Sequence, residues 1–330
     1  MQKYKAYINK INDYMDAQGL KGKISFFKIL LDVFVCSILY GATISDYFIF
    51  RFYEKRAYVR KTFITARDKR RFYAVMNDEE KRRKVQNKDI FNRDFSEYLK
   101  RDWIFTPDCG SEAFCDFVKN HESVFIKPVE LGGGEGIIKI SANDVDDLNA
   151  IYDTMCKDRK CVVEAGIVQH PDMASIHPES VNTIRICTFY DDENVRILFA
   201  GMRCGVGKAF VDNHMSGGLA MLIDSETGKV SSTASSKGEI NILKHPDTNV
   251  FLPGFQIPHW DKCLKLIDCV ARKTPGVHFV GWDLAILQDD VCLIEANPGA
   301  AFATWQETTQ TGHKAETDLL VDYMIKKRQA

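Results

Sequence analysis

The sequence predicts an α+β fold, and a change of texture along the chain is the main reason. The first hundred residues contain three glycines and no proline, and their apolar residues recur at helical spacing. From about Val124 onward, short β-rich runs alternate with turns and a few helical segments. Several of these runs are joined by short turns, so we expect partly antiparallel sheets.

The expected elements follow from the spacing of apolar residues. Strands are expected over 123–128, 136–140, 160–165, 182–190, 195–205, 219–224, 278–287 and 291–297. Helices are expected over 146–157, 259–274 and 314–329. We expect three regions: a basic helical region over 1–85, a small lobe over 86–165 and a large lobe over 166–330.

Length and composition indicate a large, well-packed protein. The 330 residues are 45% hydrophobic and 27% charged, which suits one multi-lobed domain or two modest ones. Ten cysteines include no Cys-x-x-Cys pair, and no secretory signal opens the sequence. These features predict a reduced, cytoplasmic environment.

Two N-terminal segments raise the question of a membrane or polyanion partner. Residues 51–101 hold 17 Lys and Arg against 8 Asp and Glu, which suits an anionic lipid, nucleic acid or substrate, although a solvated helix face is the interpretation we favour. Within 24–44, Lys28 and Asp32 interrupt an apolar run that is too short to span a bilayer. We expect a buried or interfacial helix, no nucleic-acid partner, and at most peripheral contact at the inner membrane face.

A glycine-rich segment joins two expected strands within 124–140. It lacks the following helix that a Walker or Rossmann loop requires, so a hairpin lid over a nucleotide fits better. Lys127, where the first strand ends, can reach a phosphate; a surface lysine is the alternative. Backbone amides can approach a phosphate closely at Gly132, Gly133, Gly134 and Gly136.

Three later features also suit a nucleotide or its substrate. The strand ending near Glu164 is a place where free backbone groups can pair with adenine, and a plain loop is the alternative. Arg185 and Arg203 lie on expected strands, where a guanidinium needs an anionic partner such as phosphate, a substrate carboxylate or a structural acid. His214, in a polar loop, either contacts substrate or is merely exposed.

The last strand pair, 280–299, carries carboxylates inside two apolar runs. If the connecting loop is 288–290, Asp283 lies opposite Glu295, and Asn297 points the same way. Like charges repel unless a cation or protons lie between them, and oxygen ligands of this kind suit Mg²⁺. A one-residue change of register would separate the carboxylates, so ordinary strand ends fit the residues equally well.

The order of these features resembles the ATP-grasp superfamily, and closely its sugar-transfer-associated members, which are also described as glutamate-ligase-related. The resemblance covers most of the chain through the segments GATISDYFIF, HPESVNTIRICTF, VDNHMSGG, GWDLAIL and LIEANPG. It implies an ATP-grasp fold, with two α+β lobes clamping ATP after a helical N-terminal region.

The resemblance also implies a role for each candidate residue. Lys88 and Lys127 would bind phosphates, with the glycine-rich segment as their lid. The adenine hinge would be Glu164, Ala165, Gly166 and Ile167. Substrate would be bound by Asn213, His214, Gly217 and Gly218, the metal by Asp283, Glu295 and Asn297, and the reaction would involve Arg185 and Arg203.

The implied function is a Mg²⁺- and ATP-dependent ligase that joins a carboxylate to an amine through an acyl phosphate. The family association suggests a sugar acid, amino sugar or amino acid of cell-surface polysaccharide biosynthesis. A small-molecule kinase with a hydroxyl acceptor would use the same residues. A non-catalytic membrane- or polyanion-binding protein is a third alternative, supported only by the basic segment.

Overall fold

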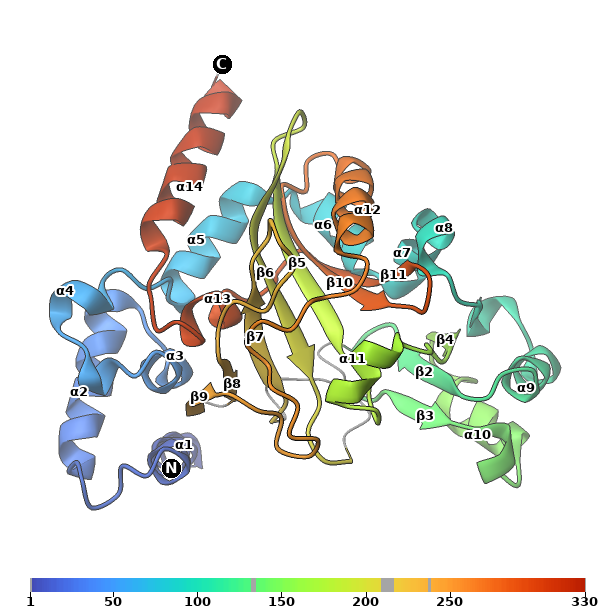
Figure 1. Ribbon diagram of the computed structural model, residues 1–330, viewed down its shortest axis with the longest axis horizontal. Helices are drawn as coiled ribbons and strands as arrows, with labels where there is room; N and C mark the ends of the chain where they lie inside the picture. Colours follow the sequence, from blue (N-terminus) through green and yellow to red (C-terminus); the bar gives the residue numbers. More distant parts are fainter. Residues whose placement is uncertain (1, 132–134, 209–216, 237–238, 330) are drawn as a thin grey trace.

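A computed structural model of the protein describes residues 2–131, 135–208, 217–236 and 239–329. Within these residues, two antiparallel sheets are surrounded by helices, and the helices of the first 60 residues form a separate group at one side (Figure 1). The predicted α+β class is therefore confirmed.

The N-terminal part of the chain is helical, as expected. The elements are α1 Gln2–Ala17, α2 Phe26–Tyr40, α3 Ile44–Ile49, η1 Phe52–Glu54, α4 Ala57–Arg60, α5 Ala66–Met76, α6 Glu79–Gln86, α7 Lys88–Asp94 and α8 Ser96–Leu99. Gly41 ends α2 with φ +65°, a conformation that glycine adopts without strain. Thr43 and Asp46 then form a capping box that starts α3. The helices before α5 enclose their own aromatic core, which includes Phe48 and Phe52.

The smaller sheet has four strands in the order β1-β4-β2-β3. Its elements are β1 Trp103–Phe105, η2 Thr106–Asp108, α9 Ser111–Lys119, β2 Val124–Pro128, β3 Ile138–Ile140, η3 Ala142–Asp144, α10 Leu148–Met155 and β4 Cys161–Ala165. Alternate β2 residues, Val124 and Ile126, are buried against α9 and α10. The other β2 side chains, including Lys127, face away from this core.

The larger sheet has seven strands in the order β11-β10-β5-β6-β7-β8-β9. The elements of this part are α11 Pro171–Ile176, β5 Thr183–Tyr190, β6 Val195–Cys204, β7 Leu219–Ile223, β8 Ala234–Ser236, β9 Glu239–Ile242, α12 Trp260–Arg272, β10 Phe279–Ile286, β11 Val291–Asn297, α13 Ala303–Glu307 and α14 Lys314–Gln329. Ile184 and Ile186 share a core with α12, whereas Phe189 and Phe199 share a core with α5 and α14. Both faces of the central strands are therefore covered.

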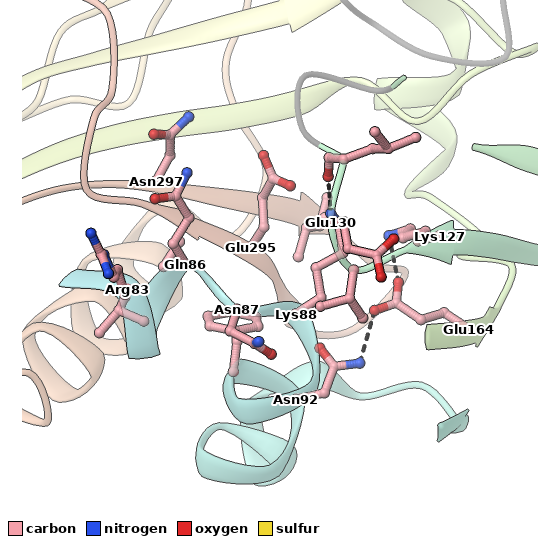
Figure 2. Close-up of a pocket in the computed structure, with 16 residues that line it drawn as sticks. Arg83, Gln86, Asn87, Lys88, Asn92, Lys127, Glu130, Glu164, Glu295 and Asn297 are labelled. Carbon is pink, nitrogen blue, oxygen red and sulfur yellow. Dashed lines mark hydrogen bonds and ion pairs between the residues drawn. The ribbon is translucent and has the colours of Figure 1, made fainter. Parts of the chain in front are cut away.

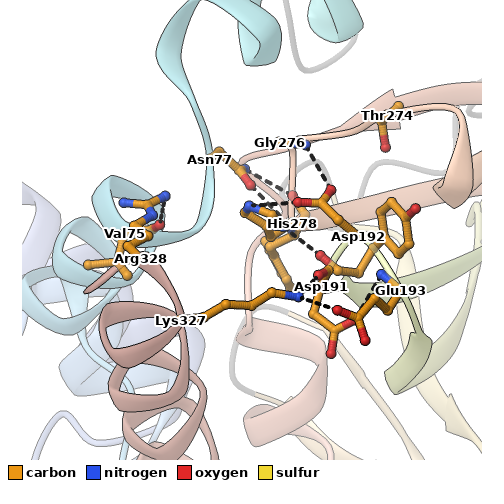
Figure 3. A network of polar contacts seen from close by, with 12 residues as sticks. Val75, Asn77, Asp191, Asp192, Glu193, Thr274, Gly276, His278, Lys327 and Arg328 are labelled. Atoms are coloured by element: carbon orange, nitrogen blue, oxygen red, sulfur yellow. Dashed lines mark hydrogen bonds and ion pairs between the residues drawn. The ribbon is translucent and has the colours of Figure 1, made fainter. Parts of the chain in front are cut away.

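Polar contacts fix the C-terminal helix to the end of the β5–β6 hairpin (Figure 3). Lys327 Nζ donates to the Asp191 carbonyl at 2.5 Å, and Tyr323 donates its hydroxyl to the buried Asp191 carboxylate at 3.0 Å. Arg328 Nη2 donates to the Val75 carbonyl at 2.6 Å. Helices α5 and α14 therefore lie side by side over the same face of the large sheet (Figure 1).

The β10–β11 hairpin confirms one predicted feature and corrects another. Asp283 lies opposite Glu295, as predicted. The predicted three-residue loop is wrong, because Ile286 pairs with Val291 and the connection is 287–290. A β-bulge at Ile294 adds one residue on β11, which restores the pairing of the two carboxylates.

The apolar run within 24–44, for which contact with a membrane was considered, forms α2. This helix packs on the other N-terminal helices along one side. In the described part of the chain, no helix has the length and apolar character that crossing a bilayer requires.

Candidate active site

A cavity of about 320 Å³ lies where the two sheets meet, a size suited to a small ligand. One wall comes from the small sheet and the other from β11, and α6 and α7 close the cavity below (Figure 2). Residues predicted to belong to the site and found along its lining are Lys88, Lys127, Glu164, Glu295 and Asn297. The fold therefore brings together five candidates that are far apart in the sequence.

Lys88 is the first residue of α7, whose N-terminus is capped by the Asn87 side chain. The Lys88 ammonium donates to the carbonyls of Pro128 and Leu131, which lie on the segment leading into the glycine-rich stretch. Burial lowers the pKa of Lys88, and Glu295 partly offsets this effect. Lys88 thus ties α7 to the segment that was predicted to cover phosphates.

Lys127 and Glu164 form a buried ion pair, with 2.5 Å between Lys127 Nζ and Glu164 Oε2. Arg101 pairs with the same oxygen at 3.0 Å, and Asn92 donates to the other oxygen at 2.9 Å. Burial alone would raise the pKa of Glu164, but the charges of Arg101 and Lys127 outweigh it and hold this pKa well below its usual range. Because an ammonium has three donors, Lys127 can bind Glu164 and a ligand oxygen together.

The segment after Glu164 was predicted to pair with adenine. The backbone amide of Ala165 donates to the Asp102 carbonyl at 2.9 Å, and that of Gly166 donates to the Ser123 carbonyl at 2.8 Å. Ala165, Gly166 and Ile167 do not line the cavity, whereas the Glu164 carboxyl group does. Two of the backbone donors expected to be free for adenine are therefore engaged within the protein.

Asp283 is 2% exposed and binds both arginines that the sequence singled out. Arg185 makes a two-pronged contact with it, and Arg203 Nη2 lies 2.8 Å from Asp283 Oδ2. Burial alone would raise the pKa of Asp283, but the two guanidinium groups outweigh it and keep this pKa well below its usual range. The sequence left phosphate, a substrate carboxylate or a structural acid as possible partners of the arginines. The structure supplies the structural acid, and this residue, Asp283, is itself a proposed metal ligand.

Glu295 differs from Asp283 although the two lie side by side. Half of its side chain is exposed to the cavity, and its nearest cation is Arg185, with 3.9 Å between Nη2 and Oε1. The surrounding protein and then the Asp283 charge raise the pKa of Glu295 to about 7. A carboxyl group with too little positive charge around it is suited to receiving a cation.

The oxygen donors at the cavity fit a magnesium ion that is bound partly by substrate. The described residues contain no cluster of three or more His, Cys, Asp or Glu able to hold a metal. Glu295 and Asn297 nevertheless offer a carboxylate and an amide oxygen on one wall, and Mg²⁺ is often held by one or two carboxylates plus phosphate oxygens. Asp283 would contribute a carboxylate oxygen from behind this wall, where its carboxylate already binds Arg185 and Arg203.

The remaining candidates lie outside this cavity or outside the described residues. Gly136 is described, with φ +70°, and Gly217 and Gly218 precede β7. The Ser236 hydroxyl donates to the Gly217 carbonyl at 3.1 Å. Positions outside the described residues are Gly132, Gly133, Gly134, Asn213 and His214.

Sequence reasoning missed two residues that shape the site. Arg101 joins its two walls, because its guanidinium also donates to the carbonyls of Leu293, at 2.7 Å, and Ile294, at 3.2 Å, on β11. Asn77 holds the loop after Asn297 by donating to the Pro298 carbonyl at 2.8 Å. No local pattern marks either residue, since their partners come from distant parts of the chain.

Comparison with known families agrees with this geometry. The profile of the family described as sugar-transfer associated ATP-grasp matches residues 53–317. The chain belongs to this family. It therefore has the ATP-grasp fold preceded by an N-terminal helical region.

Several solved structures of ATP-grasp proteins resemble this member of the family at low identity. The ATP-grasp ligase PsnB, complexed with precursor peptide PsnA2 and AMPPNP, is 13% identical with a TM-score of 0.47, over 76% of this chain and 62% of that one. D-alanyl-alanine synthetase A from Vibrio cholerae is 13% identical with a TM-score of 0.46, over 73% and 65%. The chain thus spans less than two thirds of the length of these proteins. No curated protein matches the sequence.

Proposed function

We propose that this protein is an ATP-dependent ligase that joins a carboxylate to an amine through an acyl phosphate and releases ADP and phosphate. The strongest support is the cavity itself, which places Lys88 and Lys127 on one side and Glu295 and Asn297 on the other. Cations facing oxygen donors across a small cavity are what a nucleotide with its metal requires. Membership of the ATP-grasp family supports the same conclusion.

Each side chain has a role in this proposal. Lys127, held in place by Glu164, binds phosphate oxygens, and Lys88 holds the segment that leads into the glycine-rich cover. Glu295 and Asn297, with Asp283 behind them, would hold Mg²⁺. An ion held there would supply positive charge beside the terminal phosphates of ATP.

Arg185 and Arg203 orient the substrate carboxylate. Arg185 binds Asp283 through Nε and Nη2, and because a guanidinium has five N–H donors, Arg185 retains others for a substrate oxygen. Arg185 already extends toward the cavity, as its 3.9 Å distance to Glu295 indicates. A carboxylate placed there meets positive charge next to the terminal phosphate.

The proposed reaction proceeds in two steps. A substrate carboxylate oxygen attacks the γ-phosphorus of ATP, and the bond between that phosphorus and the bridging oxygen breaks to release ADP. An amine nitrogen then attacks the acyl carbon, loses a proton and displaces phosphate. We further propose that the substrates are a sugar acid, an amino sugar or an amino acid of polysaccharide biosynthesis, which the family description alone supports.

Hydroxylamine trapping tests this function directly. Hydroxylamine replaces the amine and converts an acyl phosphate into a hydroxamate, which gives a coloured complex with ferric iron. The protein is incubated with Mg·ATP, hydroxylamine and candidate sugar acids or amino acids, and nucleotide products are separated in parallel. Glu295→Gln serves as the matched inactive variant, because it keeps the shape of the side chain and removes the charge that holds the metal.

Hydroxamate together with ADP in the wild type, and neither with Glu295→Gln, is the expected result. Accumulation of a stable phosphate ester without hydroxamate would replace the ligase by the kinase that shares these residues. Release of AMP and pyrophosphate would exclude both. Full wild-type activity in Glu295→Gln would show that this carboxylate has no role in holding the metal.

A further inference from the structure

Helix α2 is apolar on two opposite sides, although only one side packs on the protein. Ile29, Val33 and Cys36 face the N-terminal core. On the opposite side, side chains spaced three or four residues apart form a stripe in which each is between 57 and 78% exposed: Phe27, Leu31, Phe34 and Ile38. A helix that is apolar all round is normally buried on all sides, so this outward face needs a partner.

The outward face continues onto α1. Tyr7 borders a shallow apolar groove with Phe27, Leu30, Leu31 and Phe34. The groove has a volume of about 600 Å³. Figure 1 places α2 at the outer edge of the molecule, away from both sheets. The outward face therefore lies where a large flat surface can approach it.

The N-terminal residues that include this apolar face are rich in positive charge. Residues 1–71 contain 15 Lys and Arg against 6 Asp and Glu, whereas the whole chain has a net charge of −1. Exposed lysines lie on both helices and on the turn between them: Lys5, Lys10, Lys23 and Lys28, with Lys21 paired to Asp16. Lys10 follows Tyr7 by three residues and so lies one turn along the same side of α1.

The acidic residue within α2 does not oppose this arrangement. Asp32 pairs with Arg60 of α4, with 2.6 Å between Asp32 Oδ1 and Arg60 Nη1. Tyr47 of α3 donates its hydroxyl to Asp32 at 2.8 Å. The Asp32 charge is therefore neutralised from inside the protein and is held away from the outward stripe.

We propose that the outward face of α2, together with Tyr7, docks this protein in the plane of a membrane leaflet that carries anionic lipids. With 15 residues, α2 is about 22 Å long, shorter than the hydrocarbon core of a bilayer, so the helix lies along the surface. Apolar side chains enter the boundary between headgroups and acyl chains, and the lysines contact the headgroups. This inference is independent of the nucleotide chemistry.

Charge favours a membrane over a second copy of the chain. In a symmetric dimer through α2, the lysines around one stripe would face the lysines around the other, and like charges would repel. An anionic leaflet offers the complementary charge to the same lysines and covers the whole stripe at once. Pairing between copies is therefore the alternative that the experiment must separate.

Vesicle sedimentation tests the proposal with the full-length protein. Vesicles of phosphatidylcholine alone are compared with vesicles that also contain phosphatidylglycerol, at low and high salt. We expect binding to the anionic vesicles that weakens as salt rises. The triple variant Phe27→Ser, Leu31→Ser, Phe34→Ser should bind them about tenfold or more weakly.

A matched control separates this face from apolar surface in general. Leu319, on α14, is 71% exposed, so Leu319→Ser removes a comparable side chain elsewhere and should bind like the wild type. Phe27→Trp is a second variant that tests the same face if the triple variant fails to fold. Its added fluorescence should shift to shorter wavelength with anionic vesicles, relative to the wild type under the same conditions.

The contrary outcomes are distinct. Absence of sedimentation with either vesicle, or equal binding by a folded triple variant, would overturn the proposal. An added tryptophan that shows no shift would do the same. If light scattering finds a wild-type dimer that the triple variant abolishes, without vesicle binding, a second copy covers α2 instead.

Discussion

Asp283 and Glu295 face each other across one strand pair, yet the structure predicts that neutralising them changes stability by very different amounts. Asp283 accepts hydrogen bonds from Arg185 and Arg203 and is almost fully buried. Asp283→Asn keeps the size of the side chain but removes the charge opposite two largely buried guanidinium groups. Glu295→Gln removes a carboxylate whose strongest neighbour is another carboxylate.

The size of the difference follows from these contacts. Removing one partner of a buried ion pair costs about 3–5 kcal/mol, because the remaining charge loses its partner without regaining water. Since the Asn oxygen still accepts one hydrogen bond, we expect about 3 kcal/mol, or roughly 6 °C in Tm at ~2 °C per kcal/mol. For Glu295→Gln, half exposed to solvent, we expect a change in the free energy of unfolding within about 1 kcal/mol of zero.

Urea unfolding followed by circular dichroism, together with thermal melts, measures both variants against the wild type at pH 7. Turnover should be lost in both, whereas stability should fall only in Asp283→Asn. An Asp283→Asn protein that melts within a degree of the wild type would refute the conclusion that the contacts of Asp283 with Arg185 and Arg203 stabilise the fold. A strongly destabilised Glu295→Gln would show that this carboxylate is bound within the protein.

Four further outcomes follow from the same contacts. Mg·ATP at 100 times its Kd should stabilise the folded protein by about 2.7 kcal/mol, seen as a rise in Tm; no rise would remove the nucleotide proposal. Lys127→Met should weaken nucleotide binding in a titration, whereas Lys139→Met, an exposed lysine of the same sheet, should not. The pKa of Glu164 is lowered on folding, so its contribution to stability is complete above its ordinary value of 4.5 and is lost as pH falls through the lower folded value. Urea unfolding of Glu164→Gln at a series of acid pH values should lack this loss. Asn77→Ala should cost about 1–3 kcal/mol in urea unfolding, because the buried Pro298 and Phe279 backbone groups lose their partner.

The elements were largely predictable because their apolar patterns are local. The predicted strand over 182–190 is β5, and the predicted helix over 314–329 is α14. β1, with three residues, was missed because so short a run carries no periodicity. The position of Asp283 opposite Glu295 was predicted correctly from a loop of the wrong length, since the bulge at Ile294 compensated for the error.

Five of the predicted site residues line the cavity, but their contacts could not be predicted. Conspicuous residue types in suggestive places pointed to Lys127 and Glu295, whereas Lys88 was suggested by the family resemblance alone. The partner of Lys127 was not evident, because Glu164 is 37 residues away and was assigned to the adenine hinge. Arg101 gave no signal at all, since its contact on β11 lies 192 residues away. Such contacts are set by the way the two sheets meet, which no local pattern encodes.

Two buried clusters of charged side chains lie next to the cavity: one is centred on Glu164 and the other on Asp283. Both are better explained by the positions they give to charge at the cavity than by a gain in stability. Burying charges costs much of the Coulombic energy that pairing them returns, so apolar residues of the same volume would stabilise the fold at least as well. Arg101 nevertheless binds Glu164 on one wall of the cavity and backbone carbonyls of β11 on the other, so one guanidinium sets the spacing between Lys127 and Glu295. A fixed spacing between a cation and the proposed metal-binding carboxylate matters little for folding, and under the proposed function it matters much for binding a chain of phosphates. We infer that these clusters are retained because they hold charge in position before the nucleotide arrives.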